Sequence, residues 1–384
     1  MERINDFLHQ RKRHNLLREL QAAVFRRNGT IRIKDKDYID LSCNDYLGLA
    51  NHPTLKEAAK KAIDTLGTGA GASRLLSGDL EIHHQLEKEI AFLKAKESAL
   101  VFNSGYQANV GIINALCSGG DVVFFDKLAH ASIIDGILLS NVKYFRFHHN
   151  DCKHLEFLLN KQRKNFKNAF IVTETVFSMD GDTAALKELV ELKKRYNCKI
   201  MVDEAHATGV FGKNGAGLTE EKGLNHEIDF IMGTFSKALG SFGAYFACSE
   251  NVKKFLVNMC RSFIYSTALP PSVIAANLSS LQLIKDEPFR RQMLLSNADK
   301  FRNTLKEKGF SVRGSSQIVP LIVGESEKAV KLANALRENG WWVLPIRPPT
   351  VPAKEARLRF SLSYSHTPKI LEKLIYDICS NYNI

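Results

Sequence analysis

Five short apolar runs, separated by stretches with helical spacing, constrain the fold of this chain more than any other feature. They lie at residues 121–125, 169–173, 199–202, 229–232 and 243–248. Continuous apolar runs of this length are typical of strands in a parallel sheet, because helices cover both faces of such a sheet. The alternation of strand and helix patterns therefore predicts an α/β fold.

The pattern changes after Pro270 and Pro271. Two helical stretches, ending near residues 286 and 308, precede strand candidates at 319–323, 342–345 and 357–363. This grouping predicts a smaller α+β unit, and a chain of 384 residues is long for a single core. The expected organisation is an N-terminal arm at 1–45, a large domain at 46–285 and a small C-terminal domain at 286–384.

Composition and charge exclude several classes of protein. The seven cysteines are scattered without a CxxC pair, so we expect neither a disulfide framework nor a metal site. The N-terminus is too charged for a signal peptide and no apolar run reaches membrane-spanning length, which predicts a cytoplasmic protein without membrane contact. The net charge of +12 invites a nucleic-acid interpretation. Acidic residues are interleaved with the basic ones, however, so we expect no nucleic-acid partner.

Polar residues gather directly after the apolar runs, where an open α/β sheet places its ligands. Lys237 follows the run 229–232, and Asp203 and His206 follow the run 199–202. A lysine near a strand end is usually a surface residue, but a carboxylate and a histidine at a neighbouring strand end favour another interpretation. Pyridoxal phosphate (PLP) requires an amine for its Schiff base and an anion beside its ring nitrogen. The three residues therefore predict a PLP site with His206 near the phenolic oxygen.

The phosphate and the ring of PLP need further partners. Candidates for the phosphate are Gly105 and Tyr106 at a predicted helix start, then Thr234, and then Ser266 and Thr267. The alternative for the helix start is an ordinary N-cap. His130 follows the run 121–125 and is a candidate to stack on the ring, although a lone histidine is more often structural.

Several longer motifs connect these residues to a known family. They are SCNDYLGL at 42–49, FSMDGD at 177–182, VDEAHATG at 202–209, GTFSKALG at 233–240 and IRPPTVP at 346–352. With these motifs nearly the whole chain resembles the α-oxoamine synthases of PLP fold type I, which are aspartate-aminotransferase-like. The resemblance implies a large domain with a mostly parallel seven-stranded sheet covered by helices, and a smaller α+β C-terminal domain. It also implies a homodimer with the active site at the subunit interface.

The same resemblance implies a role for each site residue. The catalytic residues are Lys237, which attaches PLP, with His130, Asp203 and His206 around the ring. The cofactor site is completed by Gly105, Tyr106, Ser178 and Thr234, and by Ser266 and Thr267 next to Tyr265 from the neighbouring subunit. The substrate residues are Arg347 for the amino acid carboxylate, Arg18 and Thr350 for the acyl thioester, and Asn44.

The resemblance implies a decarboxylative condensation of an amino acid with an acyl thioester. IRPPTVP and the segment 149–151 favour the biotin-pathway branch, with L-alanine and pimeloyl-CoA or a pimeloyl-carrier protein as substrates, whereas the segment 79–81 is less typical. One alternative is a glycine C-acetyltransferase or another sister enzyme on the same scaffold. A second alternative is a non-catalytic binding protein.

Overall fold

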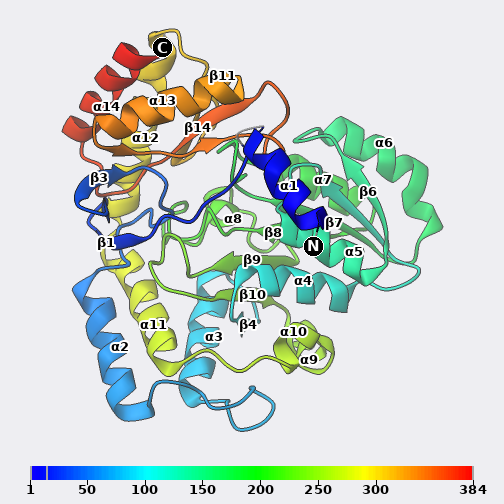
Figure 1. Cartoon of the computed structure of the whole chain (residues 1–384). Helices are drawn as coiled ribbons and strands as arrows, with labels where there is room; N and C mark the ends of the chain where they lie inside the picture. Colours follow the sequence, from blue (N-terminus) through cyan, green and yellow to red (C-terminus); the bar gives the residue numbers. More distant parts are fainter. Residues whose placement is uncertain (1, 14–15, 383–384) are drawn as a thin grey trace.

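The computed structural model describes residues 2–13 and 16–382, and these residues contain three sheets (Figure 1). The largest has seven strands. Their order is β4 (Ser98–Phe102), β10 (Ala244–Cys248), β9 (Phe230–Thr234), β8 (Lys199–Asp203), β7 (Ala169–Glu174), β5 (Val122–Asp126) and β6 (Lys143–Phe147). The five strands from β9 to β6 are parallel, and β10 is antiparallel to both of its neighbours. The prediction of a mostly parallel seven-stranded sheet is confirmed.

Helices cover both faces of this sheet, as continuous apolar strands require. The helices in this part of the chain are α3 (Glu81–Leu93), α4 (Gly105–Leu116), α5 (Ala131–Ser140), α6 (Cys152–Gln162), α7 (Leu186–Arg195), α8 (Leu218–Glu221), α9 (Glu250–Met259) and α10 (Arg261–Ile264). Alternate residues of β5 enter different apolar clusters: Phe124 belongs to the larger cluster and Phe125 to the smaller one. This alternation follows from the two-residue repeat of a strand and explains why both faces are apolar.

Two further sheets lie beside the central one, and both involve the C-terminal part of the chain. One has the order β11 (Ile318–Gly324), β14 (Ala356–Ser361) and β13 (Pro345–Ile346). The other has the order β1 (Ala23–Arg27), β2 (Thr30–Ile33), β3 (Lys36–Asp40) and β12 (Trp341–Trp342). Because β12 pairs in parallel with β3, the N-terminal segment is joined to the C-terminal unit. The three-domain division itself stays a prediction.

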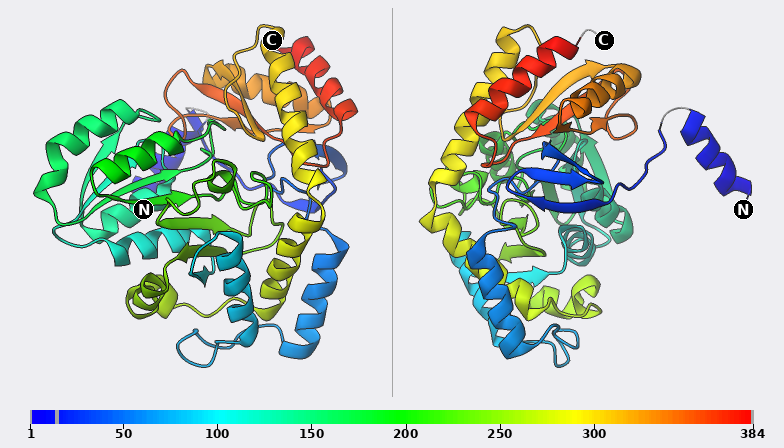
Figure 2. Two further views of the ribbon diagram at one scale, coloured as in Figure 1. Left: turned by 180° about the vertical axis from the view of Figure 1, so that it is seen from behind. Right: turned by 60° about the vertical axis from the view of Figure 1, so that its left-hand side comes forward.

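The remaining helices connect these units. They are α2 (Pro53–Leu66), α11 (Pro271–Asp286), α12 (Phe289–Glu307), α13 (Ser326–Glu338) and α14 (Pro368–Asn381). Helices α2 and α11 lie side by side, while α1 (Glu2–Arg13) extends away from the body of the molecule (Figure 2). Within residues 2–13 and 16–382, none of the helices is both long and apolar enough to cross a membrane.

Lys94 and Glu204 form an ion pair inside the protein, behind the strand end that carries Asp203. Both side chains are 0% exposed, and Lys94 Nζ lies 2.5 Å from Glu204 Oε2. Lys94 also donates to the Thr208 hydroxyl, and Glu204 Oε1 accepts from the backbone N–H of Thr219. A buried ion pair is stable only when such additional hydrogen bonds satisfy it.

We expect Lys94→Met to lower the free energy of unfolding by about 3–5 kcal/mol, because it leaves the Glu204 carboxylate unpaired in the interior. Denaturant titration followed by circular dichroism measures this loss. The control is the double variant Lys94→Met with Glu204→Leu, which removes both charges and is expected to regain most of the lost stability. An equal loss in the single and double variants contradicts the prediction.

Candidate active site

A cavity of about 200 Å³ lies at the carboxyl ends of β7, β8 and β9. Its lining consists of Gly105, Tyr106, Asn109, His130, Ser132, Glu174, Asp203, Ala205, Met232, Thr234, Ser236 and Lys237. The structure thus brings together Lys237, Asp203, His130 and the start of α4, which lie far apart in the sequence. All of them lie near strand ends or at a helix start, which is where an open α/β sheet places its ligand site.

Lys237 is held in a short chain of hydrogen bonds. Its Nζ lies 2.8 Å from His206 Nε2, and His206 Nδ1 lies 2.7 Å from the Tyr46 hydroxyl. Burial lowers the pKa of Lys237 to about 8, against the opposing effect of the nearby carboxylates Asp203 and Glu174. Burial and the positive charges of Lys237 and Arg359 hold the pKa of His206 well below its usual range, so this histidine is neutral. An ammonium that donates to Nε2 leaves the His206 proton on Nδ1, which donates to Tyr46.

Asp203 is oriented by two donors. Its Oδ1 accepts from the backbone N–H of Ala205 at 2.8 Å, and its Oδ2 accepts from Asn109 Nδ2 at 2.9 Å. Asn109 also donates to Ser132 Oγ at 3.0 Å, and Ser132 Oγ lies 2.8 Å from His130 Nδ1. Asn109 and Ser132 therefore connect Asp203 to His130. Neither was predicted, although each lies within four residues of a predicted one in the sequence.

Glu174 is the second acidic residue of the cavity lining, after Asp203, and it is not among the predicted site residues. It ends β7 beside Asp203 and is only 2% exposed. Its Oε1 makes no hydrogen bond to another residue among those that the structure describes. Burial and the neighbouring charge of Asp203 raise the pKa of Glu174 well above its usual range. This shift favours the protonated form of Glu174, which can donate a hydrogen bond into the cavity.

Arg359 is the second unpredicted residue, and it comes from β14 in the C-terminal unit. Its side chain donates to the carbonyl of Ser178 at 2.5 Å and lies 3.3 Å from Asn44 Oδ1 and 3.4 Å from the Tyr46 hydroxyl. The Tyr46 hydroxyl contacts His206, the partner of Lys237, and the charge of Arg359 contributes to the lowered pKa of that lysine. Predicted residues Asn44 and Ser178 therefore meet around Arg359, at the border between β14 and the central sheet.

Arg347 lies elsewhere. It lines a separate groove of about 550 Å³ with Arg18 and Thr350, and it is not among the residues lining the Lys237 cavity. In this groove Arg18 Nη2 donates to Thr350 Oγ1 at 3.1 Å. Burial and the charge of Arg18 lower the pKa of Arg347. Two guanidinium groups that repel one another in a groove favour an anionic ligand there.

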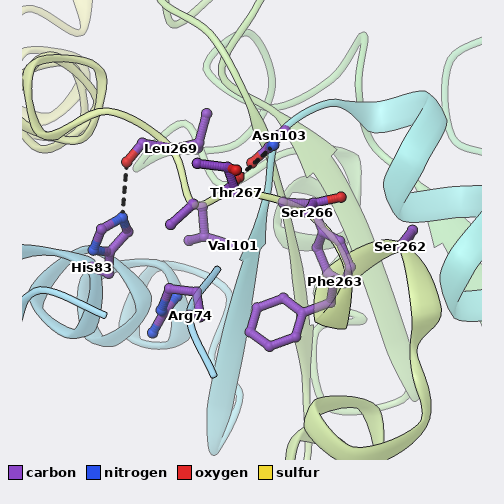
Figure 3. A pocket seen from close by; sticks show the side chains of 11 residues that line it. Arg74, His83, Val101, Asn103, Ser262, Phe263, Ser266, Thr267 and Leu269 are labelled. Atoms are coloured by element: carbon purple, nitrogen blue, oxygen red, sulfur yellow. Dashed lines mark hydrogen bonds between the residues drawn. The ribbon is translucent and has the colours of Figure 1, made fainter. Parts of the chain in front are cut away.

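Ser266 and Thr267 line another small cavity, next to Asn103 and Arg74 (Figure 3). Gln107 Nε2 donates to Ser266 Oγ at 2.6 Å, and Asn103 Nδ2 donates to the Thr267 carbonyl at 2.9 Å. Neither residue lines the Lys237 cavity of its own chain. Their role at a neighbouring subunit's cofactor stays a prediction.

The chemistry of the Lys237 cavity fits PLP. A buried lysine of lowered pKa supplies the amine, and Asp203, already fixed by two donors, supplies the anion. The N-terminus of α4, with Gly105 and Tyr106 in the cavity lining, supplies backbone N–H groups for a phosphate. An aminotransferase-like fold with this site defines a PLP-dependent enzyme.

Comparisons with known proteins agree with this class of enzyme and identify the family within it. Residues 36–378 match the family described as aminotransferase class I and II. The chain is 47% identical over 371 residues to 8-amino-7-oxononanoate synthase of Geobacter sulfurreducens, covering 96% of this chain and 95% of the relative. It is 43% identical over 378 residues to the enzyme of that name from Geotalea daltonii, covering 98% and 96%. The chain belongs to the 8-amino-7-oxononanoate synthase family.

Solved structures show the same fold, in one case with PLP bound. Serine palmitoyltransferase from S. paucimobilis with bound PLP and myriocin superposes with a TM-score of 0.94 at 32% identity, covering 100% of this chain and 98% of that one. The 8-amino-7-oxononanoate synthase of Francisella tularensis gives a TM-score of 0.78 at 31% identity, covering 90% and 98%. The fold and the PLP dependence predicted from the sequence are both confirmed.

Proposed function

We propose that this chain condenses L-alanine with a pimeloyl thioester to 8-amino-7-oxononanoate, releasing carbon dioxide and the thiol of coenzyme A or of a carrier protein. The relatives of that name support the reaction. The observation that carries the proposal is that Lys237 and Asp203 line one cavity and that Arg359 is linked to Lys237 through Tyr46 and His206. An amine, an anion and a guanidinium are what a PLP enzyme acting on an amino acid requires.

PLP, when bound, supplies an electron sink that stabilises negative charge at the α-carbon of the amino acid. Lys237 would attach the cofactor and afterwards move the α-proton, for which a pKa of about 8 is well matched to neutral pH. Asp203 would keep the ring nitrogen protonated, and His206 would face the phenolic oxygen. The residues proposed to hold the ring and the phosphate are His130, Ser178, Gly105, Tyr106 and Thr234.

We assign the carboxylate of L-alanine to Arg359 in place of Arg347. Arg359 lies against Asn44 and Tyr46, and Tyr46 contacts the histidine that binds Lys237, whereas Arg347 lies with Arg18 and Thr350 in the separate groove. Arg347 then joins Arg18 and Thr350 as a residue for the anionic thioester. We also propose a homodimer in which Ser266 and Thr267 reach the neighbour's cofactor. Location in the cytoplasm remains a prediction.

A substrate panel tests the proposed reaction. The release of free thiol is measured with L-alanine, L-serine or glycine against pimeloyl-CoA or acetyl-CoA. We expect L-alanine with pimeloyl-CoA to give a kcat/KM at least about tenfold above every other pair, the minimum discrimination for one methyl group in a fitted pocket. A preference for glycine and acetyl-CoA would instead identify a glycine C-acetyltransferase. Absence of turnover with every pair, in a protein that does not bind PLP, would favour a non-catalytic binding protein.

A further inference from the structure

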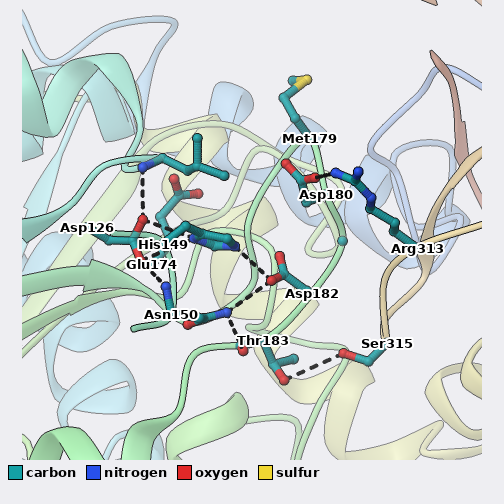
Figure 4. A network of polar contacts seen from close by, with 12 residues as sticks. Asp126, His149, Asn150, Glu174, Met179, Asp180, Asp182, Thr183, Arg313 and Ser315 are labelled. Carbon is teal, nitrogen blue, oxygen red and sulfur yellow. Dashed lines mark hydrogen bonds and ion pairs between the residues drawn. The ribbon is translucent and has the colours of Figure 1, made fainter. Parts of the chain in front are cut away.

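The ends of β5 and β6 and the loop after β7 meet in a polar network around His149 (Figure 4). His149 Nδ1 lies 3.0 Å from Asp126 Oδ1, and His149 Nε2 lies 2.8 Å from Asp182 Oδ2. An ionised carboxylate only accepts hydrogen bonds, so both ring nitrogens of His149 have to donate. The geometry therefore requires an imidazolium between two carboxylates.

The electrostatics of this network agree with its geometry. Burial alone disfavours a charged ring, but the hydrogen bonds and charges of Asp126 and Asp182 outweigh it and raise the pKa of His149 to about 10. Glu174 lies nearby in Figure 4, and the Phe177 ring meets the imidazole edge-on at a centroid distance of 4.4 Å. His149 thus keeps its positive charge throughout the neutral range.

On one side, His149 fixes the turn that leads to His130. Asp126 is 1% exposed and ends β5. Its Oδ1 also accepts from the backbone N–H of Leu128 at 2.8 Å, and its backbone carbonyl accepts from the N–H of Ala129 at 3.0 Å. A change in the orientation of the Asp126 carboxylate is therefore transmitted to the backbone immediately before His130.

On the other side, His149 fixes the loop 177–182, which carries Ser178. The carbonyl of Asp182 accepts from the N–H of Phe177 at 3.0 Å, which closes the loop on itself. Arg359 holds the Ser178 carbonyl from the β14 side. His149, together with the side-chain amide of Asn150, binds the Asp182 carboxylate on the opposite side, so both ends of the loop are held.

We infer that His149 is a positioning residue, which as the cation between Asp126 and Asp182 sets the separation of the His130 turn and the Ser178 loop around the PLP site. The inference rests on the proposed function, because it takes both His130 and Ser178 to contact the cofactor. His149 itself does not line the Lys237 cavity, so it acts through the backbone of these two segments. Displacements of about 1 Å in such segments are enough to change turnover.

The variant His149→Gln tests the inference in the holoenzyme. A glutamine amide donates from one end only, so one of the two carboxylates loses the hydrogen bond from position 149 and keeps only the hydrogen bonds from Asn150 and, for Asp126, from Leu128. We expect a fall of about tenfold in kcat and a rise of about tenfold in the rate of PLP dissociation, with little change in the KM for L-alanine. The matched control is His148→Gln, one residue earlier, where the side chain is 65% exposed. It is expected to stay within about twofold of the wild type in all three quantities.

A measurement on the wild-type holoenzyme tests the inference even when the His149→Gln variant does not fold. Nitrogen NMR of histidine-labelled protein is expected to show one doubly protonated ring, absent from the His149→Gln spectrum and unchanged between about pH 6 and pH 9. In Asp182→Asn, which keeps the shape but removes one charge, this ring is expected to titrate at lower pH. A wild-type His149 that titrates below pH 8, or a folded His149→Gln enzyme with unaltered PLP dissociation and kcat, overturns the inference. Failure of the wild type to turn over L-alanine with pimeloyl-CoA overturns only the proposed function, because NMR and PLP dissociation remain measurable.

Discussion

Purified Lys237→Ala protein is expected to stay colourless after incubation with PLP and dialysis, and to lose activity about 1,000-fold or more. The wild type is expected to be yellow, because its lysine binds the cofactor covalently. Alanine removes the amine that both attaches PLP and moves the α-proton, so no other residue of the cavity substitutes for it. The measurements are an absorbance spectrum and the release of free thiol from pimeloyl-CoA with L-alanine.

The control for this prediction is Lys222→Ala, at an exposed lysine after α8. It is expected to keep both the yellow colour and the activity of the wild type. A Lys237→Ala protein that remains yellow after dialysis would place the attachment on another lysine.

The lowered pKa of Lys237 gives this site a characteristic pH dependence. The amine is a nucleophile only when neutral, so in cofactor-free wild type the rate of PLP attachment is expected to rise with pH through about 8. A lysine of ordinary pKa would show the rise near 10.5 instead. Stopped-flow absorbance over this range measures the midpoint, and a midpoint near the ordinary value contradicts the assigned environment.

The apolar runs predict strands that are buried on both faces, but they leave out β4, which is equally buried. All five apolar runs form strands, although the run 243–248 contains the antiparallel strand β10. Strand β6 lies at the edge of the sheet, where three of its five residues are exposed, and its sequence KYFRF has no continuous apolar run. An edge strand needs only one apolar side, so the pattern that identified the central strands does not apply to it.

The predicted and the missed site residues also differ in their position relative to the strands. Lys237, Asp203 and His206 directly follow apolar runs, so the rule that ligands gather at strand ends located them. Glu174 is the last residue of a buried strand, and Arg359 lies within one, where sequence patterns indicate packing rather than chemistry. Arg359 lies 315 positions from Asn44 in the sequence, and only tertiary structure brings them within 3.3 Å.

The second large effect is expected at Arg359, where alanine substitution should lower kcat/KM for L-alanine by about 100-fold or more. A guanidinium that binds a carboxylate in a partly buried site contributes several kcal/mol, and its removal also leaves polar groups unpaired. Arg359→Lys keeps the charge but loses the paired donors, so about a tenfold loss is expected.

Arg347→Lys provides the matched comparison, because it makes the same change in the groove of Arg18 and Thr350. We expect this variant to raise the KM for the pimeloyl thioester and to leave the binding of L-alanine unchanged. Spectral titration of the PLP-loaded protein with L-alanine alone separates the two steps, since no thioester is present. Weakened L-alanine binding in Arg347→Lys, with normal binding in Arg359→Lys, would reverse the two assignments. The two arginines are thus distinguished by which substrate each variant affects, because loss of overall activity would be common to both.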